Sequence, residues 1–182
     1  MKIAAYNVNS IGARLPRILE WFDAAKPDVA VLQELKCVSE KFPELEFGDR
    51  GYNAIVNGQK SYNGVALLSK HPMEDAITRL PGEEGDDQAR YVEALITPAG
   101  ARPVRICGLY APNGNPAPGP KYDYKLAWLK RLKARVMELL TLEEAFVICG
   151  DFNVIPLAED AKNPKAWEND ALFLPATRAA YR

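Results

Sequence analysis

Hydrophobic positions along the chain fall into short runs that predict a sheet-rich α/β protein. Several of these runs are apolar on both faces, which is the pattern of strands buried inside a layered fold. They are rich in β-branched residues and are bounded by turn-forming residues. The predicted strands cover residues 3–8, 28–32, 54–56, 65–69, 92–97, 104–110 and 145–149. We therefore expect sheet that is covered on its faces by other layers.

Two segments show helical periodicity instead. Apolar residues recur at helical spacing between Leu15 and Phe22, before Pro27 ends the pattern. Residues 124–140 carry a leucine-rich stripe with basic residues between its members. The first segment gives a strand, helix, strand unit at the start of the chain, and the second leads into the last predicted strand. The middle runs are separated only by turn signals such as Asn57-Gly58, which favour antiparallel hairpins.

Composition limits the classes of partner and compartment. The 23 basic residues nearly balance the 24 acidic ones, so a net charge of −1 gives no general attraction to nucleic acid. An anionic partner would have to be held by a local patch or through a metal. The 3 cysteines form no CxxC pair and are too few and odd in number for a disulfide framework. No apolar stretch approaches membrane-spanning length, so we expect a cytoplasmic protein with no membrane partner.

Polar side chains stand at the ends of four apolar runs. Asn7, Glu34 and Tyr110 each end one run, and the last run ends in Asp151 and Asn153. In layered α/β folds ligands collect just beyond one end of the strands. Carboxylate and amide oxygens are what Mg²⁺ prefers, so these residues predict a magnesium site. Each residue also has an ordinary explanation. A strand-end glutamate is commonly solvated, an asparagine or a Gly-Asp pair commonly forms a turn, and a tyrosine can pack with its hydroxyl in water.

The motifs that contain these residues resemble the endonuclease/exonuclease/phosphatase superfamily, in particular the exonuclease III-like AP endonucleases. The matching stretches follow the order of that family along nearly the whole chain. They are YNVNSIGAR at 6–14, PDVAVLQELK at 27–36, GYNAIVNGQKSYNGVALLSK at 51–70, GLYAPNG at 108–114 and GDFNVIP at 150–156. The resemblance implies an α/β fold in the form of a four-layer α/β/β/α sandwich, two packed β-sheets with helices outside.

The resemblance also implies roles for individual residues. Asn7, Glu34, Asp151 and Asn153 would form the metal site, for Mg²⁺ with Mn²⁺ as an alternative. Tyr110 would contact the scissile phosphate, while Asp151 and Asn153 would act on the attacking water and the transition state. DNA-binding residues would be Arg90, Asn113 and Lys121. For Arg90 an exposed arginine at a strand start is an equal alternative. For Lys130, Arg131, Lys133 and Arg135 a solvated helix face is the favoured interpretation.

The implied activity is metal-dependent phosphodiester hydrolysis in DNA base excision repair, on double-stranded DNA with abasic sites or 3′ ends. Members of the family continue with strands that carry an aspartate and a Ser-Asp-His motif, and the one histidine here, His71, lies in a predicted surface turn. We therefore expect a single nuclease domain over residues 1–182 that is incomplete at its C-terminal end and has little or no activity. A complete protein would be a monomer, whereas an incomplete one would aggregate or pair with a partner.

Two other functions stay open at this stage. One is a phosphodiesterase for another phosphate ester, such as a lipid or a small molecule. The other is a non-catalytic or split-chain fragment that binds DNA or metal and pairs with a separate chain.

Overall fold

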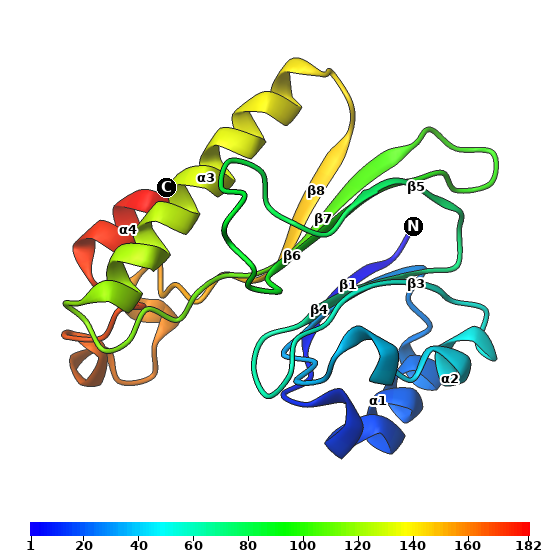
Figure 1. The fold of residues 1–182 in the computed structure, drawn as a ribbon, viewed down its shortest axis with the longest axis horizontal. Coiled ribbons are helices and arrows are strands. Elements are labelled where there is room, and N and C mark those ends of the chain that lie inside the picture. The colour runs from blue at the N-terminus through cyan, green and yellow to red at the C-terminus, as the bar shows by residue number, and fades with distance from the viewer. The chain divides into compact units, whose positions relative to one another are not determined.

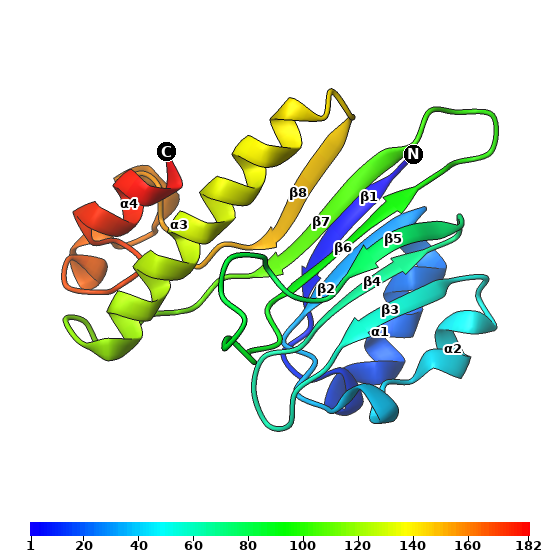
Figure 2. The same ribbon diagram turned by 45° about the horizontal axis from the view of Figure 1, so that its top comes forward.

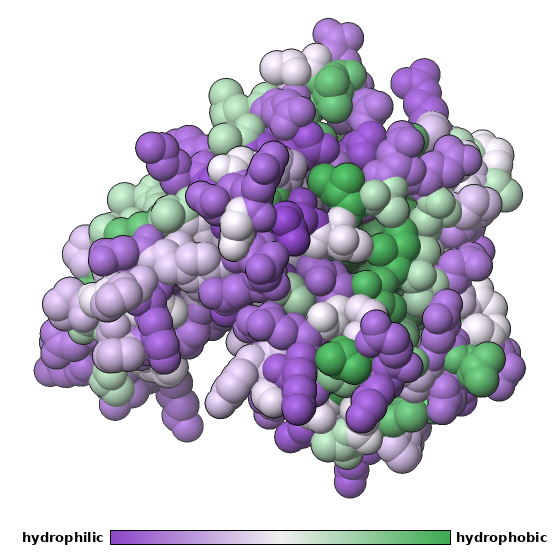
Figure 3. Space-filling view, viewed as in Figure 1, coloured by the Kyte–Doolittle hydropathy of each residue, from purple (hydrophilic) through white to green (hydrophobic).

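The computed structural model describes all 182 residues and divides them into two compact units (Figure 1). Unit 1 comprises Met1–Tyr110 and Leu139–Asp151, and unit 2 comprises Ala111–Glu138 and Phe152–Arg182. No helix has both the length and the apolar character needed to cross a membrane. On the face shown in Figure 3, hydrophilic residues predominate and hydrophobic residues gather in one band toward the right of the view.

The first sheet of unit 1 is formed in the order β1-β2-β4-β3. Its strands are β1 (Ile3–Asn7), β2 (Val29–Gln33), β3 (Asn53–Asn57) and β4 (Val65–Ser69). Helix α1 (Ile11–Ala25) joins β1 to β2, which are parallel, and the remaining pairs are antiparallel. The Ser10 side chain accepts a hydrogen bond from the amide of Ala13 and caps the start of α1. Lys26 ends the helix in the left-handed conformation.

One face of this sheet is covered by helices and the other by the second sheet. Ile18 and Phe22 of α1 and Phe47 of α2 (Glu44–Gly48) pack with Leu32 and Leu68 of the sheet in one buried cluster. The short 3₁₀ helix η1 (Ser39–Lys41) precedes α2. Burial of these large apolar side chains is the main favourable contribution to folding of this layer.

The second sheet has the order β5-β6-β7-β8 (Figure 2). Its strands are β5 (Met73–Ile77), β6 (Tyr91–Ile96), β7 (Val104–Tyr110) and β8 (Phe146–Asp151). Strands β7 and β8 are parallel, and the other pairs are antiparallel. Val92 and Ile106 of this sheet pack with Val31 and Leu67 of the first. Gly108 allows this close approach, because a Cβ there would lie 2.6 Å from Cγ1 of Val31.

Unit 2 is built from helices and loops. It contains most of α3 (Pro120–Thr141), together with η2 (Ala158–Asp160), η3 (Pro164–Trp167) and α4 (Pro175–Tyr181). Its polar core centres on the buried Thr177, whose hydroxyl donates to the Ala171 carbonyl at 2.6 Å and lies 3.1 Å from the Tyr122 hydroxyl. Phe152 and Tyr181 pack edge to face with ring centroids 5.5 Å apart.

The predicted fold class is confirmed: the chain is α/β with two packed mixed sheets, and each predicted strand is present within about two residues of its expected bounds. Strand β5 escaped prediction because its sequence MEDAI is polar and lies at a sheet edge beside a register shift. Helix α3 begins four residues before the predicted start at residue 124, at Pro120, which is well suited to a first helical turn. That residues 1–182 form a single domain stays a prediction.

Candidate active site

Four strand ends of unit 1 bring the predicted polar residues together. Asn7 ends β1, Glu34 directly follows β2, and Tyr110 and Asp151 end the paired strands β7 and β8 in register. The side-chain nitrogen of Asn7 donates to Oε1 of Glu34 and to Oδ2 of Asp151, at 2.9 Å each. The two carboxylates therefore come within hydrogen-bonding distance of one amide, although Asn7 and Asp151 are 144 residues apart in the chain.

Unusual backbone conformations support this arrangement. Glu34 has φ 56°, a left-handed conformation that is uncommon for a glutamate and turns the chain sharply after β2. Gly150, directly before Asp151, has φ 142°, and a Cβ there would lie 2.0 Å from the carbonyl oxygen of Leu109. Only glycine fits this close contact between β7 and β8, so the Gly-Asp pair is required by packing and is not simply a turn.

A lysine that the sequence analysis did not assign to the site neutralises part of its charge. Nζ of Lys36 lies 3.0 Å from Oε2 of Glu34 and also donates to Oδ1 of Asn9. The main-chain N–H of Asn9 donates to Oδ1 of Asn7 at 3.1 Å, which fixes the orientation of the Asn7 side chain. Burial opposes ionisation of Glu34, but the hydrogen bonds from Asn7 and Lys36 outweigh it, so the pKa of Glu34 lies below its usual value. Asn9 and Lys36 lie inside the motifs YNVNSIGAR and PDVAVLQELK, and this position in the sequence could have indicated that they belong to the site.

Tyr110 is held as a neutral hydrogen-bond donor. Burial, followed by the negative charge of Glu34 and the hydrogen bond to it, raises the pKa of Tyr110 to about 12. Arg90 packs over the Tyr110 ring, 5.2 Å from its centroid, and its Nη1 donates to the Tyr110 carbonyl at 3.2 Å. Nε of Arg90 donates to Gln88 at 2.8 Å. Arg90 therefore adjoins the cluster and is half-buried rather than an exposed strand-start residue.

The other predicted residues belong to unit 2. Asn113 and Lys121 are exposed, in the loop after β7 and in the first turn of α3. Asn153 follows Asp151 by two residues, adopts φ 50°, and donates from its side chain to the Ala111 carbonyl at 2.8 Å. His71 is half-buried in the turn after β4, where its amide donates to Oγ of Ser69, and it contacts none of the candidate residues.

The basic residues of α3 differ in exposure: Lys130 and Lys133 are exposed, and Arg131 and Arg135 are half-buried. Lys125, to which no role was assigned, is fully buried. Its stem packs against the loop after β7, and its ammonium donates to two main-chain carbonyls. Charge alone does not show which residues of a helix are exposed, because a lysine can be buried where its ammonium is hydrogen-bonded to acceptors.

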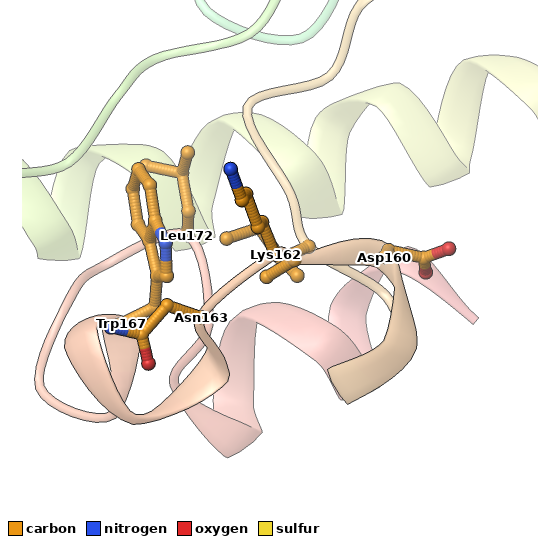
Figure 4. Close-up of a pocket in the computed structure, with 7 residues that line it drawn as sticks. Asp160, Lys162, Asn163, Trp167 and Leu172 are labelled. Atoms are coloured by element: carbon orange, nitrogen blue, oxygen red, sulfur yellow. The ribbon is translucent and has the colours of Figure 1, made fainter.

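Unit 2 also contains an open cavity. Its volume is about 530 Å³, and Figure 4 shows the side chains of Trp167 and Lys162 extending on one side while Asp160 points away from them. The lining residues are Ile155, Asp160, Ala161, Lys162, Asn163, Trp167 and Leu172. None of the residues predicted for the active site lines it.

The donor set at the strand ends fits a hard divalent cation. Nowhere in the chain do three or more carboxylate, imidazole or thiol groups gather as a metal cluster. Glu34 and Asp151 offer two carboxylates beside the Asn7 amide, and Mg²⁺ is commonly bound by one or two carboxylates with water and substrate phosphate completing its shell. No thiol or imidazole lies in this group, so softer metals are disfavoured.

Comparison with known proteins identifies the family. Residues 4–181 match the endonuclease/exonuclease/phosphatase family. The chain belongs to this family. It is similar to exodeoxyribonuclease III of Haemophilus influenzae, with 30% identity over 189 aligned positions that cover 100% of this chain and 70% of the relative.

Solved structures of similar proteins agree with this family assignment. An AP endonuclease from Archaeoglobus fulgidus is 37% identical with a TM-score of 0.91, over 100% of this chain and 68% of its own. The 3′ phosphatase NExo from Neisseria, solved with a product DNA hairpin, is 33% identical with a TM-score of 0.92, over 100% and 68%. The chain thus spans about two thirds of the length of these relatives.

Proposed function

We propose that this family member is a divalent-metal-dependent phosphodiester hydrolase acting on DNA, of the exonuclease III and AP endonuclease type, with a role in base excision repair. The observation that carries the proposal is the Asn7 amide, which joins the Glu34 and Asp151 carboxylates where four strands end. The similarity to an exodeoxyribonuclease III and to a DNA-bound relative supports DNA as the substrate. Abasic duplex and 3′ ends are the substrates we propose.

Glu34 and Asp151, with the amides of Asn7 and Asn153, would hold Mg²⁺ or Mn²⁺. The bound ion would neutralise charge that develops on the phosphate oxygens during attack. Asp151, as a carboxylate, would orient the attacking water and accept its proton. Because the pKa of Tyr110 is raised to about 12, its hydroxyl stays protonated at physiological pH and would donate to a phosphate oxygen.

Sequence-independent contacts to the DNA backbone would come from Arg90, Asn113 and Lys121. Arg90 adjoins Tyr110 through its ring contact, and exposed Asn113 and Lys121 would reach backbone phosphates. A net charge of −1 makes such local contacts necessary, because the chain as a whole does not attract DNA.

Incision of a duplex with a single abasic site tests this proposal. We expect slow cleavage by the 182-residue chain, far below the rate of a full-length relative, that requires Mg²⁺ and is lost in Glu34→Ala. Glu40→Ala, at an exposed glutamate of η1, is the matched control and should leave cleavage unchanged. Rapid cleavage by the 182-residue chain would refute the expected low activity but support the proposed hydrolase function. Cleavage that survives in Glu34→Ala would refute the proposed active site.

A split-chain role also has one specific observation in its favour. Strand β8 is an edge of its sheet and is half-buried along its whole length, with no charge before Asp151. The opposite edge, β5, carries Glu74 and Asp75, the charged residues that commonly protect an edge from pairing. Light scattering would test the idea: a monomer at every concentration, with no strand-supplying partner, would speak against it.

A further inference from the structure

The ammonium group of Lys125 connects two loops of unit 2 that carry proposed site residues. Nζ of Lys125 donates to the main-chain carbonyl of Asn113 at 3.0 Å and to that of Asn153 at 2.5 Å. The side chain is fully buried, with 0% exposed. A buried ammonium is tolerated only when its donors are hydrogen-bonded, so these contacts are required as well as present.

The loops after β7 and β8 also contact each other, and the loop after β7 packs on the lysine. The side chain of Asn153 donates to the Ala111 carbonyl at 2.8 Å, so Asn153 is fixed at its side chain and at its main chain. Gly114 has φ 90°, and a Cβ there would lie 2.7 Å from Cδ of Lys125. The loop after β7 therefore lies directly on the aliphatic stem of the lysine whose head holds the loop after β8.

From this geometry we infer that Lys125 is a positioning residue, which sets the main chain of Asn113 and Asn153 without touching DNA itself. This inference rests on the proposed function for the roles of the two asparagines. Asn153 adopts a left-handed φ of 50°, and a residue in that conformation keeps it only where surrounding contacts determine it. A hydrogen bond from a charged group to the carbonyl of that same residue is such a contact.

Lys125→Met tests the inference, because methionine keeps most of the stem and removes the ammonium. Amide hydrogen exchange followed by mass spectrometry should show exchange about tenfold faster or more in peptides covering 111–115 and 152–155, with the strands of unit 1 unchanged. Lys125→Arg, which keeps the charge and the donors, should restore part of the protection. Lys133→Met, at an exposed lysine of the same helix, is the matched control and should change neither loop.

Gly114→Ala provides a second route if Lys125→Met fails to fold. The added methyl would press on the lysine stem, so exchange should rise in both loops together. Exchange that rises at 111–115 alone, or stays at the wild-type rate in Lys125→Met, would overturn the inference. Faster exchange spread evenly over both units would also overturn it, since it would mark a general structural role.

Kinetics separate this inference from the proposed function. If the wild-type chain incises abasic DNA, Lys125→Met should lower kcat by about 100-fold with little change in KM, since small misplacement of a reacting group costs about that much. An unchanged kcat would contradict positioning for catalysis. If the wild-type chain does not incise DNA, the proposed function fails for this chain, while the exchange data still decide whether Lys125 holds the two loops.

Discussion

The second sheet contains a buried ion pair whose removal should destabilise the protein strongly. The side chain of Glu93 on β6 is 0% exposed, and that of Arg105 on β7 is 9% exposed, with Nη1 and Oε1 3.0 Å apart. The Tyr91 hydroxyl donates to the other oxygen of Glu93 at 2.7 Å, and Nε of Arg105 donates to Glu144 at 3.1 Å. Arg105→Met keeps the apolar stem and removes the charge that compensates Glu93.

The expected cost follows from the burial of both partners. Removing one member of a buried ion pair typically costs about 3–5 kcal/mol, because the other charge is left without its counter-ion. The total free energy of unfolding of a domain is only about 5–15 kcal/mol, so this loss would be a large fraction of it. At about 2–4 °C per kcal/mol for a chain of this size, the Tm should fall by roughly 10 °C.

Urea unfolding followed by circular dichroism would measure the loss, and a double variant would identify its cause. Glu93→Gln removes the negative charge and keeps the shape, so Glu93→Gln with Arg105→Met should recover a large part of the stability lost in Arg105→Met alone. A loss below about 1 kcal/mol in Arg105→Met would refute the reasoning, because a buried carboxylate that has lost its counter-ion costs more than that. A double variant less stable than Arg105→Met would refute it as well.

Three further predictions concern the site, the sheet and alkaline pH. Mg²⁺ at tenfold its dissociation constant should stabilise the chain by about 1.4 kcal/mol, seen as a rise in Tm that Glu34→Gln loses; an equal rise in the variant would contradict the metal site. Gly150→Ala should destabilise by about 3 kcal/mol or more in urea because of its contact with Leu109, whereas Gly12→Ala, where no atom lies within 4 Å, should be neutral or slightly stabilising. Burial, then the nearby carboxylates, raises the pKa of Tyr52 to about 12, so the unfolded chain loses this proton at a lower pH and the free energy of unfolding should fall as pH rises from 10 to 12. Urea unfolding across that range should show a shallower fall in Tyr52→Phe; the same fall in the variant and the wild type would contradict the prediction.

The strand-end residues could be predicted from sequence because their position depends on simple periodicity. Each of Asn7, Glu34, Tyr110 and Asp151 follows an apolar run, and runs that form layered sheets place their ends at common edges. The contact between Asn7 and Asp151 needed more than this pattern, because β1 and β8 belong to different sheets. The family resemblance supplied that step, and the packing of the two sheets explains it physically.

The buried charges could not be predicted, because their sequence context is indistinguishable from that of exposed ones. Lys125 and Lys133 lie on one amphipathic helix, yet one is fully buried and the other is exposed. The difference is decided by carbonyl groups at Asn113 and Asn153, which are 12 and 28 residues away from Lys125. Glu93 and Arg105 likewise stand in strands that read as apolar, and they pair there with each other and with Tyr91 and Glu144.

These two kinds of residue have different consequences for a change in sequence. The strand-end carboxylates are half-buried, and glutamine keeps the shape of Glu34, so Glu34→Gln should remove metal binding with little loss of stability. Lys125 and Arg105 are buried, so replacing them should alter structure first and function as a result. Comparing stability, loop exchange and kcat for Glu34→Gln and Lys125→Met therefore separates chemistry from positioning. The first should lose activity at nearly unchanged stability and loop exchange, and the second should lose activity together with faster exchange in the two loops. If Glu34→Gln instead unfolds the protein, the strand-end cluster is a structural network, and its assignment as an active site fails.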